Sequence, residues 1–230
     1  MKRLLKLELS RSFKNGGFLF ALIVGIIIAF LQLITSALPY ALGLDFTMSY
    51  GYPMTHPGWL YSLWLGGDPA SMFSYLYFLI LPIIAVLPYG DSFFTDAKGG
   101  FIQNLCIRTD RKCYYKAKYL AAFLSGGTAV VLPLILNFVG CAMLFPSMKP
   151  EVTSMTSAIR EVSSFPELYY NHPFLYVLLF LAIIFIFSGL LADFGLVSSY
   201  IAGYRFLVLL APFILYLCLL YTSDAADDSL

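Results

Sequence analysis

The sequence predicts an all-α integral membrane protein, and three observations lead to that class. Of the 230 residues, 60% are apolar and 12% are charged, whereas soluble domains carry about 25% charged residues. The apolar residues gather in five long runs separated by polar segments. If each run crosses a membrane once, 12 of the 14 Lys and Arg residues fall on the same side. Lipid is therefore the predicted solvent for most of the chain.

The N-terminal segment, residues 1–15, is predicted to be an amphipathic elbow helix on the cytoplasmic leaflet. Its apolar side chains recur every fourth residue on one side: Leu5, Leu9 and Phe13. Its basic and polar side chains take the other side: Arg3, Lys6, Ser10 and Lys14. Gly16 and Gly17 then let the chain turn into the membrane. The alternative is a basic flank that only stops translocation.

The five apolar runs are predicted to be transmembrane helices. They cover residues 18–38, 72–89, 119–145, 173–191 and 201–220. In the first, Ala21, Gly25 and Ala29 make a small face that suits close helix packing. In the third, Asn137 is expected to be satisfied by an interhelical hydrogen bond; a role in lining a pathway is the alternative.

The basic residues predict the orientation, because basic loops stay in the cytoplasm during insertion. The N-terminus and the loop over residues 90–118 are therefore predicted to be cytoplasmic, and the membrane to be the cytoplasmic (inner) membrane. Residues 39–71 would lie outside. There, the Trp-containing stretch 58–65 is expected to lie flat at the outer interface, where Trp is favoured.

The last residues do not resemble a membrane protein. Residues 218–227 repeat one reading frame of a common transposase sequencing adapter. We therefore expect residues 218–230 to be non-native, and residues 1–217 to be one incomplete transmembrane domain. A sixth span would then be lost by C-terminal truncation.

The sequence lacks the motifs that mark several kinds of binding and catalytic site. It holds no phosphate-binding P-loop, no Gly-x-Ser-x-Gly elbow and no His-Glu-x-x-His pair. The four cysteines have no zinc-site spacing, and a net charge of +1 gives no reason to expect a nucleic-acid partner. We predict no catalytic, cofactor-binding or metal-binding residues, so any energy source lies in another subunit.

The loop over residues 90–118 is the candidate functional segment. Residues 90–92 can end one helix and cap another, and Thr109-Asp110 is a helix N-cap signal before a basic helix that runs straight into the third span. Between them, apolar residues share one side of a possible short helix. A short amphipathic helix between two spans, rimmed with charge, is typical of a device moved by a cytoplasmic motor; the alternative is a solvated basic loop that only sets topology. The candidate coupling residues are Asp91, Asp96, Phe101, Ile102, Leu105 and Arg108.

Three motifs resemble a known family. Residues 87–96 (LPYGDSFFTD), 99–102 (GGFI) and 123–127 (FLSGG) are similar to the bacterial ATP-binding-cassette (ABC) export permeases, whose members have six spans and an N-terminal elbow helix. The resemblance covers residues 1–217. It implies that two permease chains pair, as a homodimer or heterodimer. Each would dock a cytoplasmic ABC ATPase that binds ATP, with the loop over residues 91–118 in a groove on that ATPase.

Two other functions stay open. A membrane-embedded lipid-modifying enzyme would need acidic or His groups at the membrane face, and Asp91 and Asp96 are its candidates. A non-transporting membrane anchor or sensor would also fit the long cytoplasmic loop.

Overall fold

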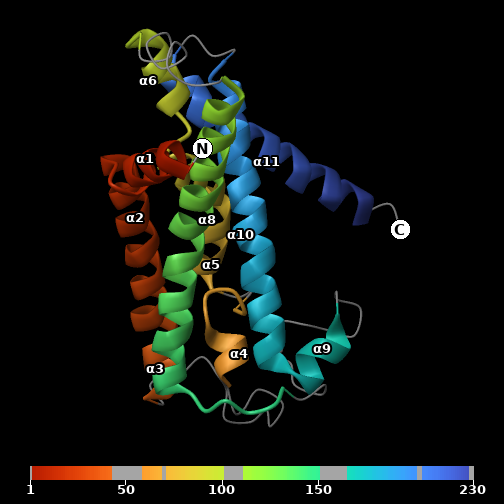
Figure 1. Ribbon diagram of the computed structural model, residues 1–230. Helices are drawn as coiled ribbons and strands as arrows, with labels where there is room; N and C mark the ends of the chain where they lie inside the picture. The colour runs from red at the N-terminus through yellow and green to blue at the C-terminus, as the bar shows by residue number, and fades with distance from the viewer. Residues whose placement is uncertain are drawn as a thin grey trace. The chain divides into compact units, whose positions relative to one another are not determined.

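The computed structural model describes residues 2–42, 59–68, 71–100, 111–150, 165–200 and 204–227. Within these ranges every regular element is a helix, which confirms the all-α class (Figure 1). Three helical stretches are long and apolar enough to cross a membrane: Gly16–Ala41, Arg111–Leu144 and Pro173–Ser198. Two shorter apolar helices cover Met72–Val86 and Phe206–Thr222. A total of five spans stays a prediction.

The chain begins with helix α1 (Lys2–Phe13), which is followed after a two-residue turn by α2 (Gly16–Gln32). The predicted turn before the first span is therefore confirmed. A close backbone approach explains its second glycine: a Cβ on Gly17 would lie 3.3 Å from the carbonyl carbon of Leu87. Asn15 also fixes the turn by donating a hydrogen bond from Nδ2 to the carbonyl of the next residue, Pro88, at 2.8 Å.

The first span is one continuous helical stretch made of three parts. After α2 the helix widens into a π turn, η1 (Leu33–Ala37), and ends as α3 (Leu38–Ala41). Its small face packs inward as predicted, because Ala21 and Ala29 are buried. A Cβ on Gly25 would lie 3.2 Å from Cβ of Pro133, so only glycine allows this approach.

Helices α5 (Met72–Val86) and α6 (Ser92–Lys98) flank a five-residue turn. Helix α6 starts where the sequence predicts, with Asp91 at its N-cap position. Helix α8 (Arg111–Leu144) joins the basic segment 111–118 and the third apolar run into one helix of 34 residues. The predicted cap at residues 109–110 lies outside the described residues.

The C-terminal part of the chain contains α9 (Pro166–Asn171), α10 (Pro173–Ser198) and α11 (Arg205–Asp227). Helix α10 begins at Pro173 as predicted but continues seven residues beyond the predicted end of the fourth run. Helix α11 begins at Arg205, four residues after the predicted start of the fifth run.

The chain divides into two compact units. Unit 1 comprises Met1–Val24, Ile80–Val130 and Ile184–Leu230, and unit 2 comprises Gly25–Leu79 and Val131–Ile183. Unit 1 has an apolar core whose buried members come from the turn after α5 and from α6, α8 and α10. They are Tyr89, Phe93, Ala121, Ala122 and Leu196. Leu9 of α1 packs against this core.

Unit 2 corrects one expectation from the sequence. The stretch that contains both tryptophans does not lie flat at an interface, because Trp59 and Trp64 are only 4% and 3% exposed. The ring of Trp64 packs edge-on against Phe138 and Phe180 instead. Packing against neighbouring aromatic rings therefore outweighs the preference of Trp for the membrane surface.

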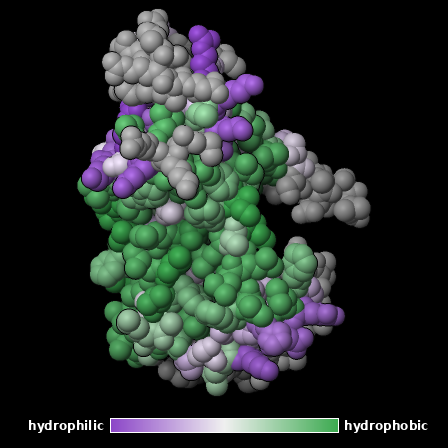
Figure 2. All heavy atoms as spheres, in the orientation of Figure 1, coloured by the Kyte–Doolittle hydropathy of each residue, from purple (hydrophilic) through white to green (hydrophobic). Residues whose placement is uncertain are grey.

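Large apolar side chains remain exposed along the long helices. Phe30 of α2 is 60% exposed and Leu190 of α10 is 57% exposed. The visible face of these helices is largely apolar (Figure 2). A surface of this kind is stable in lipid and costly in water, which agrees with membrane-spanning helices.

Candidate functional site

The candidate site is a cluster of charged and tyrosine side chains in unit 1, which we call the Asp96 cluster. It consists of Glu8, Arg11, Tyr89, Asp96, Tyr114 and Lys118. Helices α1, α6 and α8 and the turn after α5 supply these residues. Asp96, near the end of α6 at Lys98, lies five residues before the segment 101–110.

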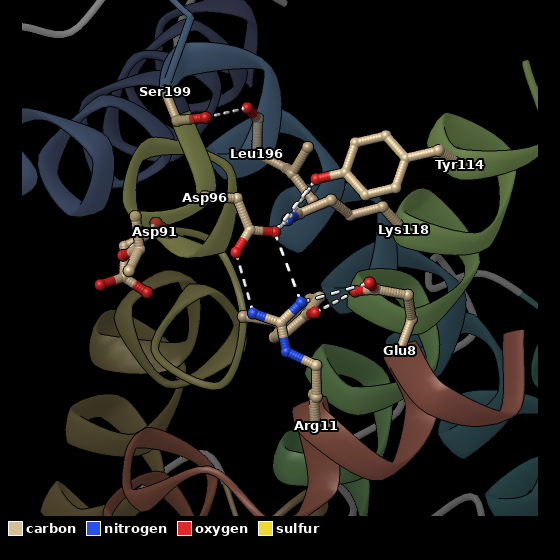
Figure 3. A network of polar contacts seen from close by, with 10 residues as sticks. Glu8, Arg11, Asp91, Asp96, Tyr114, Lys118, Leu196 and Ser199 are labelled. Carbon is tan, nitrogen blue, oxygen red and sulfur yellow. Dashed lines mark hydrogen bonds and ion pairs between the residues drawn. The ribbon is translucent and has the colours of Figure 1, made fainter. Parts of the chain in front are cut away.

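Asp96 lies at the centre of the cluster (Figure 3). Arg11 donates from Nη2 to Oδ1 of Asp96 at 2.8 Å and from Nη1 to Oδ2 at 3.5 Å. Lys118 donates from Nζ to Oδ2, and Tyr114 donates from its hydroxyl to the same oxygen at 3.0 Å. One carboxylate of α6 is thereby joined to a base of α1 and a base of α8.

Glu8 extends the cluster along α1. Its Oε1 accepts a bond from Nη1 of Arg11 at 3.3 Å, and its Oε2 accepts a bond from the hydroxyl of Tyr89. Because Arg11 contacts both carboxylates, the two acids and the two bases of the cluster form one network without net charge.

The network is largely removed from solvent. Glu8 and Lys118 are fully buried and Asp96 is 3% exposed, whereas the side chain of Arg11 stays 38% exposed. Burying a charge is costly unless it is paired and hydrogen-bonded. Each buried charge here has such a partner, so breaking one pair would strand another charge in an apolar setting.

The pKa directions follow from this geometry. Burial alone would raise the pKa of the Asp96 carboxyl, but the hydrogen bonds from Arg11 and Lys118 hold that pKa below its usual value. Burial would lower the pKa of the Arg11 guanidinium, but its bond to Asp96 raises that pKa. Both groups therefore stay ionised near neutral pH.

Aromatic rings also anchor α6, through Phe93. The ring centroid of Phe93 lies 3.9 Å from that of Tyr200, at the end of α10, and 6.3 Å from that of Tyr115 on α8. Helix α6 is thus fixed by ion pairs through Asp96 and by ring packing through Phe93. A displacement of α6 would have to move α1 and α8 with it or break these contacts.

Of the two predicted coupling residues that the structure describes, it brings Asp96 into the cluster. Asp96 is its centre, while Asp91 occupies the N-cap position of α6 and lies apart from the cluster (Figure 3). Phe101, Ile102, Leu105 and Arg108 lie outside the described residues. Their assignment as coupling residues stays a prediction.

Sequence reasoning missed the partners of Asp96. Lys118 lies on α8, as the predicted basic helix before the third span requires, but it is fully buried, whereas the sequence places it among the basic residues of the cytoplasmic loop. Glu8 and Ser12 also occupy the buried side of α1, where only apolar side chains were expected. One signal was available: Glu8 and Arg11 are spaced by three, as expected for a helical ion pair.

Metal chemistry has no visible site in the part of the chain that the structure describes. No three His, Cys, Asp or Glu side chains there are grouped so that they could hold an ion. What the Asp96 cluster offers is mechanical: it ties together three elements that are far apart in the sequence.

No protein-family model, curated protein or solved structure matches this chain. The family resemblance therefore rests on the sequence motifs alone.

Proposed function

We propose that this chain is the membrane-spanning subunit of an ABC exporter in the cytoplasmic membrane, with its N-terminus inside. A separate cytoplasmic ATPase would bind the segment 99–110 and move it during ATP hydrolysis. The chain would pair with a second permease chain. In this proposal α1 is the elbow helix, and the two shorter apolar helices complete five spans.

The observation that carries the proposal is the position of the Asp96 cluster. It joins α6, which precedes the proposed docking segment, to α8, which follows that segment and is a candidate span. A push on the segment would reach α8 directly along the chain and again through Asp96 and Lys118. A loop that only set topology would need no such buried connection.

The charge distribution supports the same arrangement. Four exposed basic side chains all belong to unit 1: Lys6 on α1, Lys14 directly after α1, and Lys112 and Lys116 near the start of α8. This is the side that the positive-inside rule assigns to the cytoplasm.

The lipid-modifying enzyme is less well supported. Its candidate base Asp96 is held by two cations, and its pKa lies below the usual value. A general base works best when its pKa lies near the working pH. An ion-paired carboxylate of this kind suits an anchor better than a proton acceptor.

A photo-crosslinking experiment tests the proposal. A photoreactive amino acid replaces Phe101 in the chain, which is expressed in its native host. Irradiation should give a covalent product with a cytoplasmic ABC ATPase, and Phe101→Asp should remove most of the ATPase that co-purifies. Met148→Asp is the matched control, because Met148 is 48% exposed beyond the opposite end of α8 and should leave co-purification unchanged. If no ATPase is recovered with the photoreactive chain or with the Met148→Asp control, the proposal is wrong.

A further inference from the structure

The segment Trp59–Asp68, which includes the short helix α4 (Leu60–Leu63), is buried inside unit 2. Six of its side chains are at most 4% exposed: Trp59, Leu60, Tyr61, Ser62, Trp64 and Leu65. A segment that only linked two spans across the membrane surface would expose much of this apolar area.

Most of the backbone of this segment is not helical, and two side chains from long helices satisfy its polar groups. The amide of Leu65 donates to Oδ1 of Asn137 on α8 at 2.8 Å. The carbonyl of Leu63 accepts from Nε2 of Gln32, at the end of α2, at 2.9 Å. Irregular backbone at membrane depth is tolerated only where protein groups or water satisfy it, and these contacts meet that requirement at Leu63 and Leu65.

The two amides are also bonded to each other. Nδ2 of Asn137 donates to Oε1 of Gln32 at 2.7 Å and to the carbonyl of Ala29 at 2.9 Å. We call Gln32 and Asn137 the amide pair. Asn137 is therefore satisfied by interhelical hydrogen bonds, as the sequence predicts. Directly after Gln32 the helix changes to the π turn η1, and π turns are frequent at functional sites.

The amide pair lies well inside the long helices. Asn137 precedes the end of α8 at Leu144 by seven residues, which is about 10 Å of helix. Gln32 precedes the end of α3 at Ala41 by nine residues, which is about 14 Å. The segment begins at the end of α8, where the amide of Leu60 donates to the Pro146 carbonyl at 3.4 Å, and reaches between the helices at Leu63 and Leu65.

Contacts to all three candidate spans hold the segment in place. The Trp64 ring centroid lies 5.3 Å from that of Phe138 on α8 and 5.6 Å from that of Phe180 on α10. The contacts of Gln32 add the first span, and Figure 1 shows α4 between α8 and α10. The segment thus fills the space between these helices in unit 2.

We propose that Trp59–Asp68 is a re-entrant plug, inserted between the spans at membrane depth and clipped there by the amide pair. That the plug blocks an export path rests on the proposed function. The depth of the segment and the bonds that the amide pair makes to it do not rest on the proposed function, because they concern this chain alone.

Intrinsic fluorescence tests the proposal, because Trp59 and Trp64 are the two tryptophans of the chain. The full chain is reconstituted into phosphatidylcholine vesicles. Aqueous iodide should quench the emission several-fold less than it quenches the chain unfolded in denaturant. Lipids brominated along the acyl chain should quench more than iodide does. Stronger quenching by iodide than by brominated lipid would overturn the proposal.

Asn137→Leu tests the clip, because leucine has a similar size but can bond neither Leu65 nor Gln32. We expect a red-shifted emission and at least a doubling of iodide quenching. Leu136→Ala is the matched control: this neighbouring side chain is 50% exposed, and its loss should change neither quantity. Gln32→Leu should act like Asn137→Leu. Unchanged emission in both amide variants would show that the pair does not hold the segment.

Thiol labelling gives a second measurement on the same variants. Cys141 is fully buried, and its Sγ lies 3.7 Å from the Leu63 carbonyl oxygen. With Cys106, Cys113 and Cys218 replaced by Ser, a maleimide should label Cys141 at least tenfold faster when Asn137 is Leu. If the plug fails these tests while the ATPase still crosslinks at residue 101, the proposed function stands and the plug does not. If the plug passes these tests while no ATPase crosslinks at residue 101, the plug stands and the proposed function does not.

Discussion

At the scale of single residues, Asp96 has the most consequential position in the described chain. It is a buried carboxylate with one base from α1 and another from α8. The expected cost of disturbing such a centre comes less from the lost attraction than from the charges left behind. Asp96 is therefore the residue at which the described structure is most sensitive to a conservative change.

We predict that Asp96→Asn destabilises the protein by about 3–5 kcal/mol, because it leaves the buried Lys118 without a counter-charge. Thermal or denaturant unfolding in detergent measures the difference. Asp91→Asn is the control, since it makes the same chemical change one helix turn away and outside the cluster. Its expected cost is about 1 kcal/mol or less. Equal costs for the two variants would contradict the role assigned to Asp96.

The free energy of unfolding should depend on pH through the carboxylate of Asp96. The folded-state pKa of Asp96 lies below its unfolded value, so its contribution is complete above about pH 5. It is lost as the pH falls below about 4, through the folded-state pKa. Unfolding free energies between pH 3 and 7 should therefore fall more steeply toward acid for the wild type than for Asp96→Asn. Parallel curves would show that Asp96 keeps an ordinary pKa.

At the scale of elements, the helices were easier to predict than their contacts. The starts of α6 and α10 follow from local signals, namely the Gly90–Ser92 turn and Pro173. The Asp96 cluster does not, because Arg11 and Asp96 are 85 residues apart and no local pattern pairs them. The burial of Lys118 could not be predicted for the same reason, since a lysine at the edge of a span shows nothing of which side of its helix is buried.

The tryptophan segment shows the limit of composition as a guide. Trp favours membrane interfaces on average, so a flat position for residues 58–65 was the natural expectation. The amide pair that holds the segment comes from helices far away in the sequence. Only the tertiary structure shows that its backbone can be satisfied at depth.

The junction of α1 and α2 gives a prediction at this scale. A Cβ at Gly17 would lie 3.3 Å from the carbonyl carbon of Leu87, so Gly17→Ala should cost about 1–3 kcal/mol. The adjacent Gly16 has nothing within 4 Å of such a Cβ. Gly16→Ala should therefore be neutral, or stabilising by about 0.5–1 kcal/mol. Melting temperatures in detergent compare the two, and equal shifts would contradict the close approach.

At the scale of the whole molecule, the described residues contain three helices long and apolar enough to span a membrane, and two shorter apolar helices. Nothing in the described spans binds a nucleotide by a recognised motif. In the proposed function, the motor would reach the chain from the side of the membrane that carries residues 99–110. Three predictions require this segment to lie in the cytoplasm: the ATPase partner, the coupling residues and the cytoplasmic N-terminus.

The side of the membrane on which Cys106 lies tests this premise most directly. In a variant that keeps Cys106 as its single cysteine, a membrane-impermeant maleimide is added to intact cells and to inverted membrane vesicles. Met148→Cys in a chain without other cysteines serves as the reporter for the opposite side. The account predicts that Cys106 is labelled in inverted vesicles and protected in intact cells, with the reverse for residue 148. Labelling of Cys106 in intact cells would contradict it.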